Sequence, residues 1–221
     1  MFVADPHQIN VWTHIAAGAV ALAVGLVPLF SRKGGPLHRW SGRVTAGLGV
    51  LVLGSATLAT LLFNPPAPLM AATLSAGYQY LSGLRTLMLN RRGPGLPDAL
   101  LALAGLGLSA LILFQMGQGS TSWSPAFGYA TIGFLSAITL YDLSRFFWIS
   151  TWYRNVRSLD HGVKMIGFYF AMLSAGAGNL LAELQPLSQI LPSVMGMVAM
   201  IGFVIWYSLH PINKRPSNAT A

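Results

Sequence analysis

Seven apolar segments, each about as long as a membrane-spanning helix, make up most of this 221-residue chain. A helix needs about 20 mostly apolar residues to cross the hydrocarbon core of a bilayer. The segments cover residues 11–30, 44–63, 69–89, 99–116, 127–148, 163–182 and 187–209. Only 8% of the residues are charged, whereas soluble domains carry roughly 25%. The sequence therefore predicts an all-α, polytopic membrane bundle of seven helices, forming a single domain over residues 1–221.

The basic residues predict how this bundle is oriented. All thirteen Lys and Arg residues fall on one side of it. They form four clusters, namely Arg32, Lys33, Arg39 and Arg43; Arg85, Arg91 and Arg92; Arg145, Arg154, Arg157 and Lys164; and Lys214 and Arg215. Loops that stay in the cytoplasm carry an excess of Lys and Arg. We therefore expect an external N-terminus and a cytoplasmic C-terminus.

The net charge of +8 is better explained by this orientation than by nucleic-acid binding. No basic run accompanies a soluble fold or an RNA-type aromatic motif. The basic side is expected to attract anionic lipid headgroups. The chain contains no cysteine, which excludes disulfides, iron–sulfur clusters and Cys-based zinc sites. Hydrolase and ATP-binding motifs are also missing, which disfavours a hydrolase or an ATP-driven enzyme but leaves other activities open.

Three of the five histidines are expected near helix ends on the cytoplasmic side. His38 precedes the second apolar segment, His161 precedes the sixth, and His210 follows the seventh. Neutral imidazoles at one depth are ligands for b-type haem or, as a second choice, a metal such as copper. Met165 lies one turn after His161, and a His–Met pair suits both haem iron and copper. The alternative is ordinary interfacial histidines beside a gap-filling methionine, so no metal site is assigned.

Arg39 and Arg43 follow His38 at helical spacing. They share one helix face because they lie four residues apart. Two guanidinium groups on one face form a clamp for a lipid headgroup, a haem propionate or another anionic ligand. The alternative is that they only orient the second helix, which the charge pattern favours.

Polar residues within the apolar segments are functional candidates, because unpaired polar groups are costly at membrane depth. The candidates are His14, Asn179 and Glu183 toward the outside, Tyr78 and Gln79 near the middle, and Arg85, Asp142 and Arg145 toward the cytoplasm. Asp142 and Arg145 are three residues apart and can neutralise each other. Arg85 either extends to the interface or binds Asp142. His14 with Glu183 or Asn179 would relay protons, or would form a static hydrogen bond between two helix ends.

Four local patterns occur in order along most of the chain. They are His14-Ile-x-x-Gly18; Lys33-Gly-Gly-Pro-Leu-His38-Arg39-x-x-Gly42-Arg43; Ser82-Gly83-x-Arg85; and His161-x-x-x-Met165-Ile166 followed by Asn179. Together they resemble the bacterial multi-pass membrane proteins grouped as domain of unknown function 2306. The resemblance implies a small helical membrane protein with these polar positions, located in the inner (cytoplasmic) membrane of a bacterium. It brings no activity with it. Members often have an aromatic residue soon after Gly-Arg, where this chain has Val44-Thr45.

Two kinds of function fit these observations. The first is a membrane-embedded redox or electron-transfer module, in which His161 and either His38 or His210 ligate haem b near the cytoplasmic face. Arg39 and Arg43 would then bind the carboxylates of the cofactor. The second is an accessory subunit of a larger membrane complex, or a small-solute or proton-linked transporter whose path runs from His14 through Gln79 to Arg85.

Overall fold

The computed structural model describes residues 5–63, 67–119 and 125–210, and every regular element in these ranges is helical. The long helices are α1 (Pro6–Phe30), α2 (Pro36–Leu62), α3 (Ala67–Met88), α4 (Leu96–Gly117), α5 (Pro125–Ser144), α7 (Arg157–Leu180) and α8 (Leu187–Leu209). Short elements are η1 (Arg145–Phe147), α6 (Ile149–Thr151), η2 (Trp152–Val156) and η3 (Ala182–Leu184). The last basic cluster, Lys214 and Arg215, lies outside the described residues.

Several of these helices have the length and apolar character of membrane spans. Four of them, α1, α2, α4 and α8, are long and apolar enough to cross a bilayer. A bent pair, residues 128–147 and 149–180, turns by 104° at its break and raises the number to five if it counts as one span. Large apolar side chains such as Phe30, Phe147 and Leu180 are at least 85% exposed in the isolated chain. Such a surface fits hydrocarbon rather than water as its surroundings.

Among the long helices, α2 and α7 begin furthest ahead of the apolar segments predicted from the sequence. α2 begins at Pro36, where a proline in the first helical position suits the helix start because its missing N–H is not needed there. α7 begins at Arg157 and carries Asp160 in its first turn. His38 and His161 therefore lie inside helices, although the sequence predicts them just before the helix starts.

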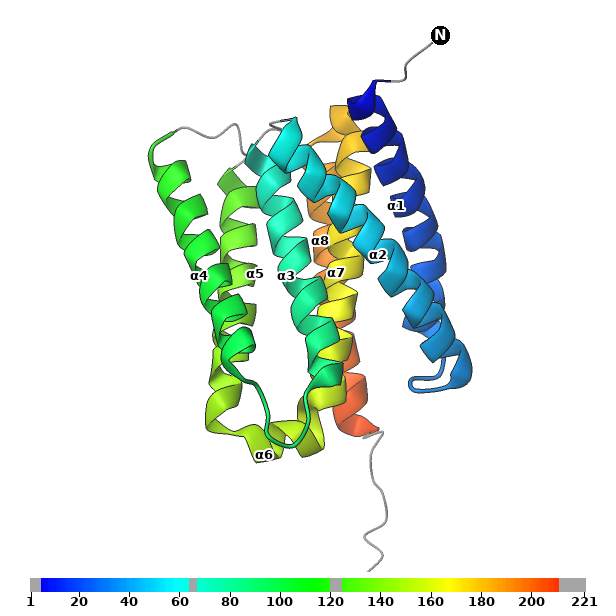
Figure 1. Cartoon of the computed structure of the whole chain (residues 1–221), viewed down its shortest axis with the longest axis vertical. Helices are drawn as coiled ribbons and strands as arrows, with labels where there is room; N and C mark the ends of the chain where they lie inside the picture. The colour runs from blue at the N-terminus through cyan, green and yellow to red at the C-terminus, as the bar shows by residue number, and fades with distance from the viewer. Residues whose placement is uncertain (1–4, 64–66, 120–124, 211–221) are drawn as a thin grey trace, which may run out of the picture.

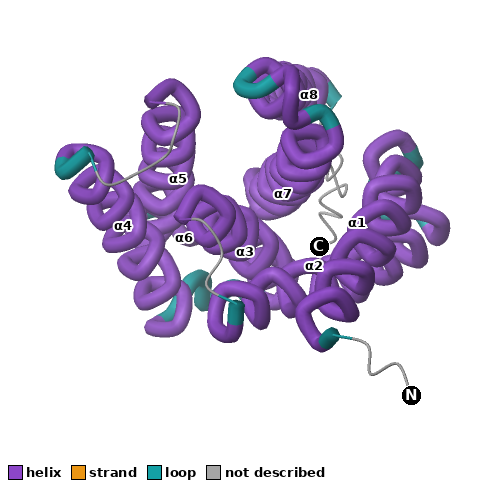
Figure 2. The backbone as a smooth tube through the Cα atoms, turned by 90° about the horizontal axis from the view of Figure 1, so that it is seen from above, coloured by secondary structure: helices purple, strands orange, loops and turns teal. Residues whose placement is uncertain are grey.

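α3 and α7 pack against each other in the middle of the molecule (Figures 1 and 2). On one side of this pair lie α1 and α2, and on the other side lie α4 and α5, while α8 packs mainly on α7. One apolar core joins α1, α2, α3 and α7 through residues that include Ala21, Tyr80 and Phe168. A second core around Tyr78 and Leu135 joins α3 to α4 and α5. The central pair is thus shielded by its neighbours along much of its length.

The connections that carry basic residues lie at one end of the bundle. The turn between α1 and α2, the turn between α3 and α4, and the bend from η1 through η2 all lie at the lower end of Figure 1. Arg32 and Lys33 belong to the first turn, Arg91 and Arg92 to the second, and Arg145 and Arg154 to the bend. For these described residues, the structure agrees with the one-sided distribution of basic residues that the sequence predicts.

Candidate functional site

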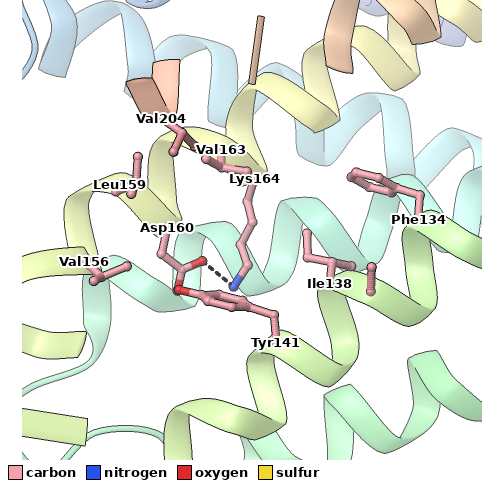
Figure 3. Close-up of a pocket in the computed structure, with 10 residues that line it drawn as sticks. Phe134, Ile138, Tyr141, Val156, Leu159, Asp160, Val163, Lys164 and Val204 are labelled. Atoms are coloured by element: carbon pink, nitrogen blue, oxygen red, sulfur yellow. Dashed lines mark ion pairs between the residues drawn. The ribbon is translucent and has the colours of Figure 1, made fainter. Parts of the chain in front are cut away.

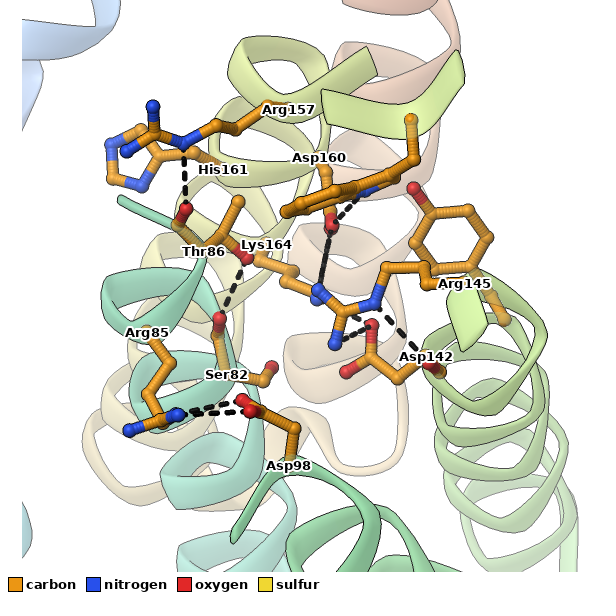
Figure 4. A network of polar contacts seen from close by, with 12 residues as sticks. Ser82, Arg85, Thr86, Asp98, Asp142, Arg145, Arg157, Asp160, His161 and Lys164 are labelled. Atoms are coloured by element: carbon orange, nitrogen blue, oxygen red, sulfur yellow. Dashed lines mark hydrogen bonds and ion pairs between the residues drawn. The ribbon is translucent and has the colours of Figure 1, made fainter. Parts of the chain in front are cut away.

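Four charged side chains meet between α5 and α7, and each is at most 4% exposed (Figure 4). We call Asp142, Arg145, Asp160 and Lys164 the ion cluster. Lys164 Nζ lies 2.5 Å from Asp142 Oδ1 and 2.8 Å from Asp160 Oδ1. The Arg145 guanidinium lies 3.1 Å from each of the same two carboxylates. Because two carboxylates face two cations, the cluster carries no net charge, which is what burial requires of ionised groups.

Two neutral side chains complete the hydrogen bonding of the ion cluster. Tyr78 Oη donates to Asp142 Oδ2 over 2.6 Å, and Trp152 Nε1 donates to Asp160 Oδ2 over 2.9 Å. Trp152 belongs to the π-helical turn η2, and its ring also lies 5.2 Å from the Arg145 guanidinium carbon. The cluster therefore joins α3, α5, η1, η2 and α7. A buried polar network that is fully hydrogen-bonded holds its helices in one arrangement.

A separate ion pair joins α3 to α4. Arg85 donates from Nε to Asp98 Oδ1 over 2.7 Å and from Nη2 to Asp98 Oδ2 over 2.8 Å. Asp98 Oδ2 also accepts from the Gly95 backbone N–H at the start of α4, over 2.9 Å. The sequence predicts either that Arg85 extends to the interface or that it binds Asp142. The structure gives it Asp98, which is only 4% exposed, as its partner.

His38 and His161 come from different helices, and both lie near helix starts at the basic end of the bundle. His38 Nδ1 bonds to the Pro28 backbone oxygen of α1 over 3.1 Å. His161 Nδ1 bonds to the Gly83 backbone oxygen of α3 over 3.0 Å. A carbonyl oxygen can only accept, so each Nδ1 carries the proton and each Nε2 is left with a free lone pair. Histidines that bind metals are usually held in this way by a partner on the other ring nitrogen.

Basic residues flank His38 along the chain. Lys33 Nζ donates to the backbone oxygens of Pro28 and Leu29, at the C-terminal end of α1. Half-burial of this ammonium group lowers the pKa of Lys33 below its usual value. Arg39 and Arg43 are exposed, and among the described residues neither has an acidic partner. An anion next to His38 would therefore meet unpaired positive charge.

The other two cofactor candidates are placed differently from His38. The imidazole of His210 stacks on Trp206 at 5.9 Å, and its Nδ1 bonds to the Trp206 backbone oxygen, so it faces its own helix. The methyl group of Met165 packs against Gly83, where an added Cβ would lie only 2.5 Å away. Met165 and His161 therefore face the same residue of α3, as their spacing predicts.

The three candidates predicted toward the outside do not meet. His14 Nδ1 lies 2.9 Å from Ser55 Oγ and 3.1 Å from the Val52 backbone oxygen, so its partners belong to α2. Asn179 bonds to the Ala175 backbone oxygen of its own helix. Glu183 lies exposed in η3, with no ion pair among the described residues. The hydrogen-bond partners of His14 therefore lie on α2, and among the described residues no hydrogen bond or ion pair joins His14 to Glu183.

A cavity of about 330 Å³ lies beside the ion cluster, between α5, α7 and α8 (Figure 3). Phe134, Ile138 and Val204 supply apolar walls, and Asp160 and Lys164 lie at its inner side. The charged atoms of Asp160 and Lys164 are bonded to each other and to the rest of the cluster. The cavity therefore presents mainly carbon atoms, whereas the polar groups face the seam between α3, α5 and α7.

The sequence predicts half of the ion cluster. Asp142 and Arg145 were expected to pair because of their spacing, and they do. The roles of Asp160 and Lys164 were missed, although their spacing of four residues on one helix was a usable signal. The role of Trp152 had no such signal, because its position depends on the π-helical turn. The pairing of Arg85 with Asp98 depends on how α3 and α4 pack.

The chain matches no known family model, and no curated protein or solved structure is detectably similar to it. Membership of the domain of unknown function 2306 family therefore stays a prediction from four local patterns.

Proposed function

We propose that this protein is a seven-span membrane protein with its N-terminus outside and its C-terminus in the cytoplasm, in the inner membrane of a bacterium. Its seven long helices are 20 to 27 residues in length, enough to cross the hydrocarbon core. The helices α3, α5 and α7 carry most of the ion cluster and its partners, and the other long helices pack around them. The basic end would face the cytoplasm and its anionic lipid headgroups.

We further propose that the protein is a redox module that holds haem b between His38 and His161. The observation that carries this proposal is a pair of imidazoles from different helices at the same end of the bundle, each fixed through Nδ1 by a backbone carbonyl. Both Nε2 atoms then have a free lone pair, which is the donor that haem iron accepts. Of the two partners considered for His161, the geometry supports His38, because His210 is exposed and stacks on Trp206.

The surrounding charges suit the rest of such a cofactor. The exposed guanidinium groups of Arg39 and Arg43 are available to bind the propionates of haem. When bound, the iron would supply one-electron transfer. The chain itself would contribute the two imidazole donors, their fixed orientation and the positive charge.

The absorption spectrum of the purified full-length protein tests this function. We expect a redox-sensitive Soret band in protein that is expressed with sufficient haem supply. His38→Ala and His161→Ala should each lower the haem content at least tenfold, because one axial ligand is lost. His210→Ala and His14→Ala serve as matched controls and should retain the band.

The haem content is compared at equal amounts of monodisperse protein, so that misfolding does not imitate the loss of a ligand. A wild-type protein that stays colourless and does not take up added haemin would contradict the proposal. The same holds if His210→Ala loses haem and His38→Ala does not, because the ligand pair would then be a different one.

A further inference from the structure

Helix α3 turns a row of buried polar side chains toward its neighbours. Ser75, Gln79, Ser82 and Thr86 are 7%, 3%, 3% and 0% exposed. Their spacing of four, three and four residues places them on one face of the helix. We call this row the α3 polar face. Such a face is unusual in the middle of an apolar bundle, where each polar group needs a partner.

Two atoms of the α3 polar face have no such partner. Gln79 Oε1 and Ser82 Oγ are buried without a hydrogen bond to any described residue. Thr86, by contrast, bonds to the Ser82 backbone oxygen over 2.8 Å. Buried polar groups are nearly always hydrogen-bonded, and internal water is the usual partner where protein atoms provide none. Gln79 Oε1 and Ser82 Oγ therefore lack the partner that internal water would supply.

The α3 polar face leads directly to the ion cluster. Gln79 packs against Gly167 of α7, three residues after Lys164. Gly83, which follows Ser82, packs against the side chain of Lys164. Tyr78, which precedes Gln79, donates its hydroxyl to Asp142. Figure 4 shows Ser82 between the Arg85–Asp98 pair and the ion cluster. Water held by Gln79 and Ser82 would thus lie beside a buried carboxylate.

We infer that the α3 polar face is part of a proton-transfer route, in which water held by Gln79 and Ser82 exchanges protons with Asp142. An excess proton on the water moves to the Asp142 carboxylate and leaves an ordinary water behind. Asp142 then returns the proton to water, so the cluster regains its neutral balance and no other bond changes. The titratable groups around Asp142 are Arg145, Asp160 and Lys164 of the cluster, together with Tyr78 and Tyr141.

Proton flux into lipid vesicles tests the inference. The full-length protein is reconstituted into vesicles of phosphatidylethanolamine and phosphatidylglycerol that contain a pH-sensitive dye, and a potassium gradient with valinomycin drives proton entry. We expect flux above that of empty vesicles. Gln79→Leu, Ser82→Ala and Asp142→Asn should each lower it at least tenfold. Thr73→Ala is the matched control on α3, because the Thr73 hydroxyl bonds to the Leu69 backbone oxygen of its own helix and this bond is exposed.

Thermal unfolding of the same variants tests whether Gln79 and Ser82 hold water. If no water is bound to these side chains, Gln79→Leu and Ser82→Ala remove unpaired polar atoms and should raise the melting temperature. If water is bound there, these variants lose its hydrogen bonds, and the melting temperature should not rise. Wild-type flux no greater than that of empty vesicles, or flux that survives both α3 variants, would overturn the inference. It does not depend on haem, so the two proposals fail separately.

Discussion

The ion cluster is stable in an apolar bundle because each of its two carboxylates meets both of its cations. Lys164 bridges Asp142 and Asp160 from one side, and Arg145 bridges them from the other. The four charges therefore form one unit rather than two independent salt bridges. Removing one member of a buried unit leaves an uncompensated charge, which costs far more than the unit itself contributes. The consequence can be tested on single residues.

Lys164→Met should lower the stability of the protein by about 3–5 kcal/mol, because two carboxylates would then share one guanidinium group. The double variant Lys164→Met with Asp142→Asn restores neutrality and should recover most of this loss. Both are measured as unfolding free energies in detergent, with the exposed Arg154→Met as control. Equal stabilities of the single and double variants would show that the four charges are not coupled.

At the level of the helices, hydropathy predicted the apolar segments well but not where each helix begins. α2 and α7 start outside their apolar segments, because a helix can continue into the interface, where polar residues are tolerated. The central helices α3 and α7 are also less apolar than α1, α2, α4 and α8. Their polar residues face one another inside the bundle, and a sequence does not reveal which helices are neighbours. Asp98 was therefore not predicted as the partner of Arg85.

The seam between α3 and α7 depends on close approach at Gly83. A Cβ there would lie 2.5 Å from the methyl group of Met165 and 3.0 Å from Lys164 Cβ. Gly83→Val should therefore separate the two helices and lower the unfolding free energy by about 1–3 kcal/mol, as overpacking of a close contact does. Gly107→Val is the control, because an added Cβ at Gly107 has no neighbour within 4 Å. If both variants were equally stable, the close approach of α3 and α7 would be wrong.

For the molecule as a whole, the arrangement explains why the polar groups are found where they are. α3 and α7 occupy the centre, and the most apolar helices lie around them (Figure 2). His38 lies in the first turn of α2, His161 near the start of α7 and Asp142 near the end of α5. The histidine pair and the ion cluster therefore both lie near the end that carries the basic connections. The orientation of the bundle decides which compartment these groups face, so the topology determines the side from which each proposed site is reached.

Cysteine accessibility measures that topology directly, because the chain contains no cysteine of its own. Gln118 and Glu183 are exposed at the end proposed to be external, and Arg91 and Ser150 at the cytoplasmic end. Single cysteines at Gln118 and Glu183 should react with an impermeant maleimide on intact cells, and those at Arg91 and Ser150 only after the membrane is opened. The opposite pattern would reverse the orientation. A cysteine at residue 150 that stays unreactive on both sides would instead place the bend between α5 and α7 inside the bilayer. The two helices would then form one bent span and not two separate crossings.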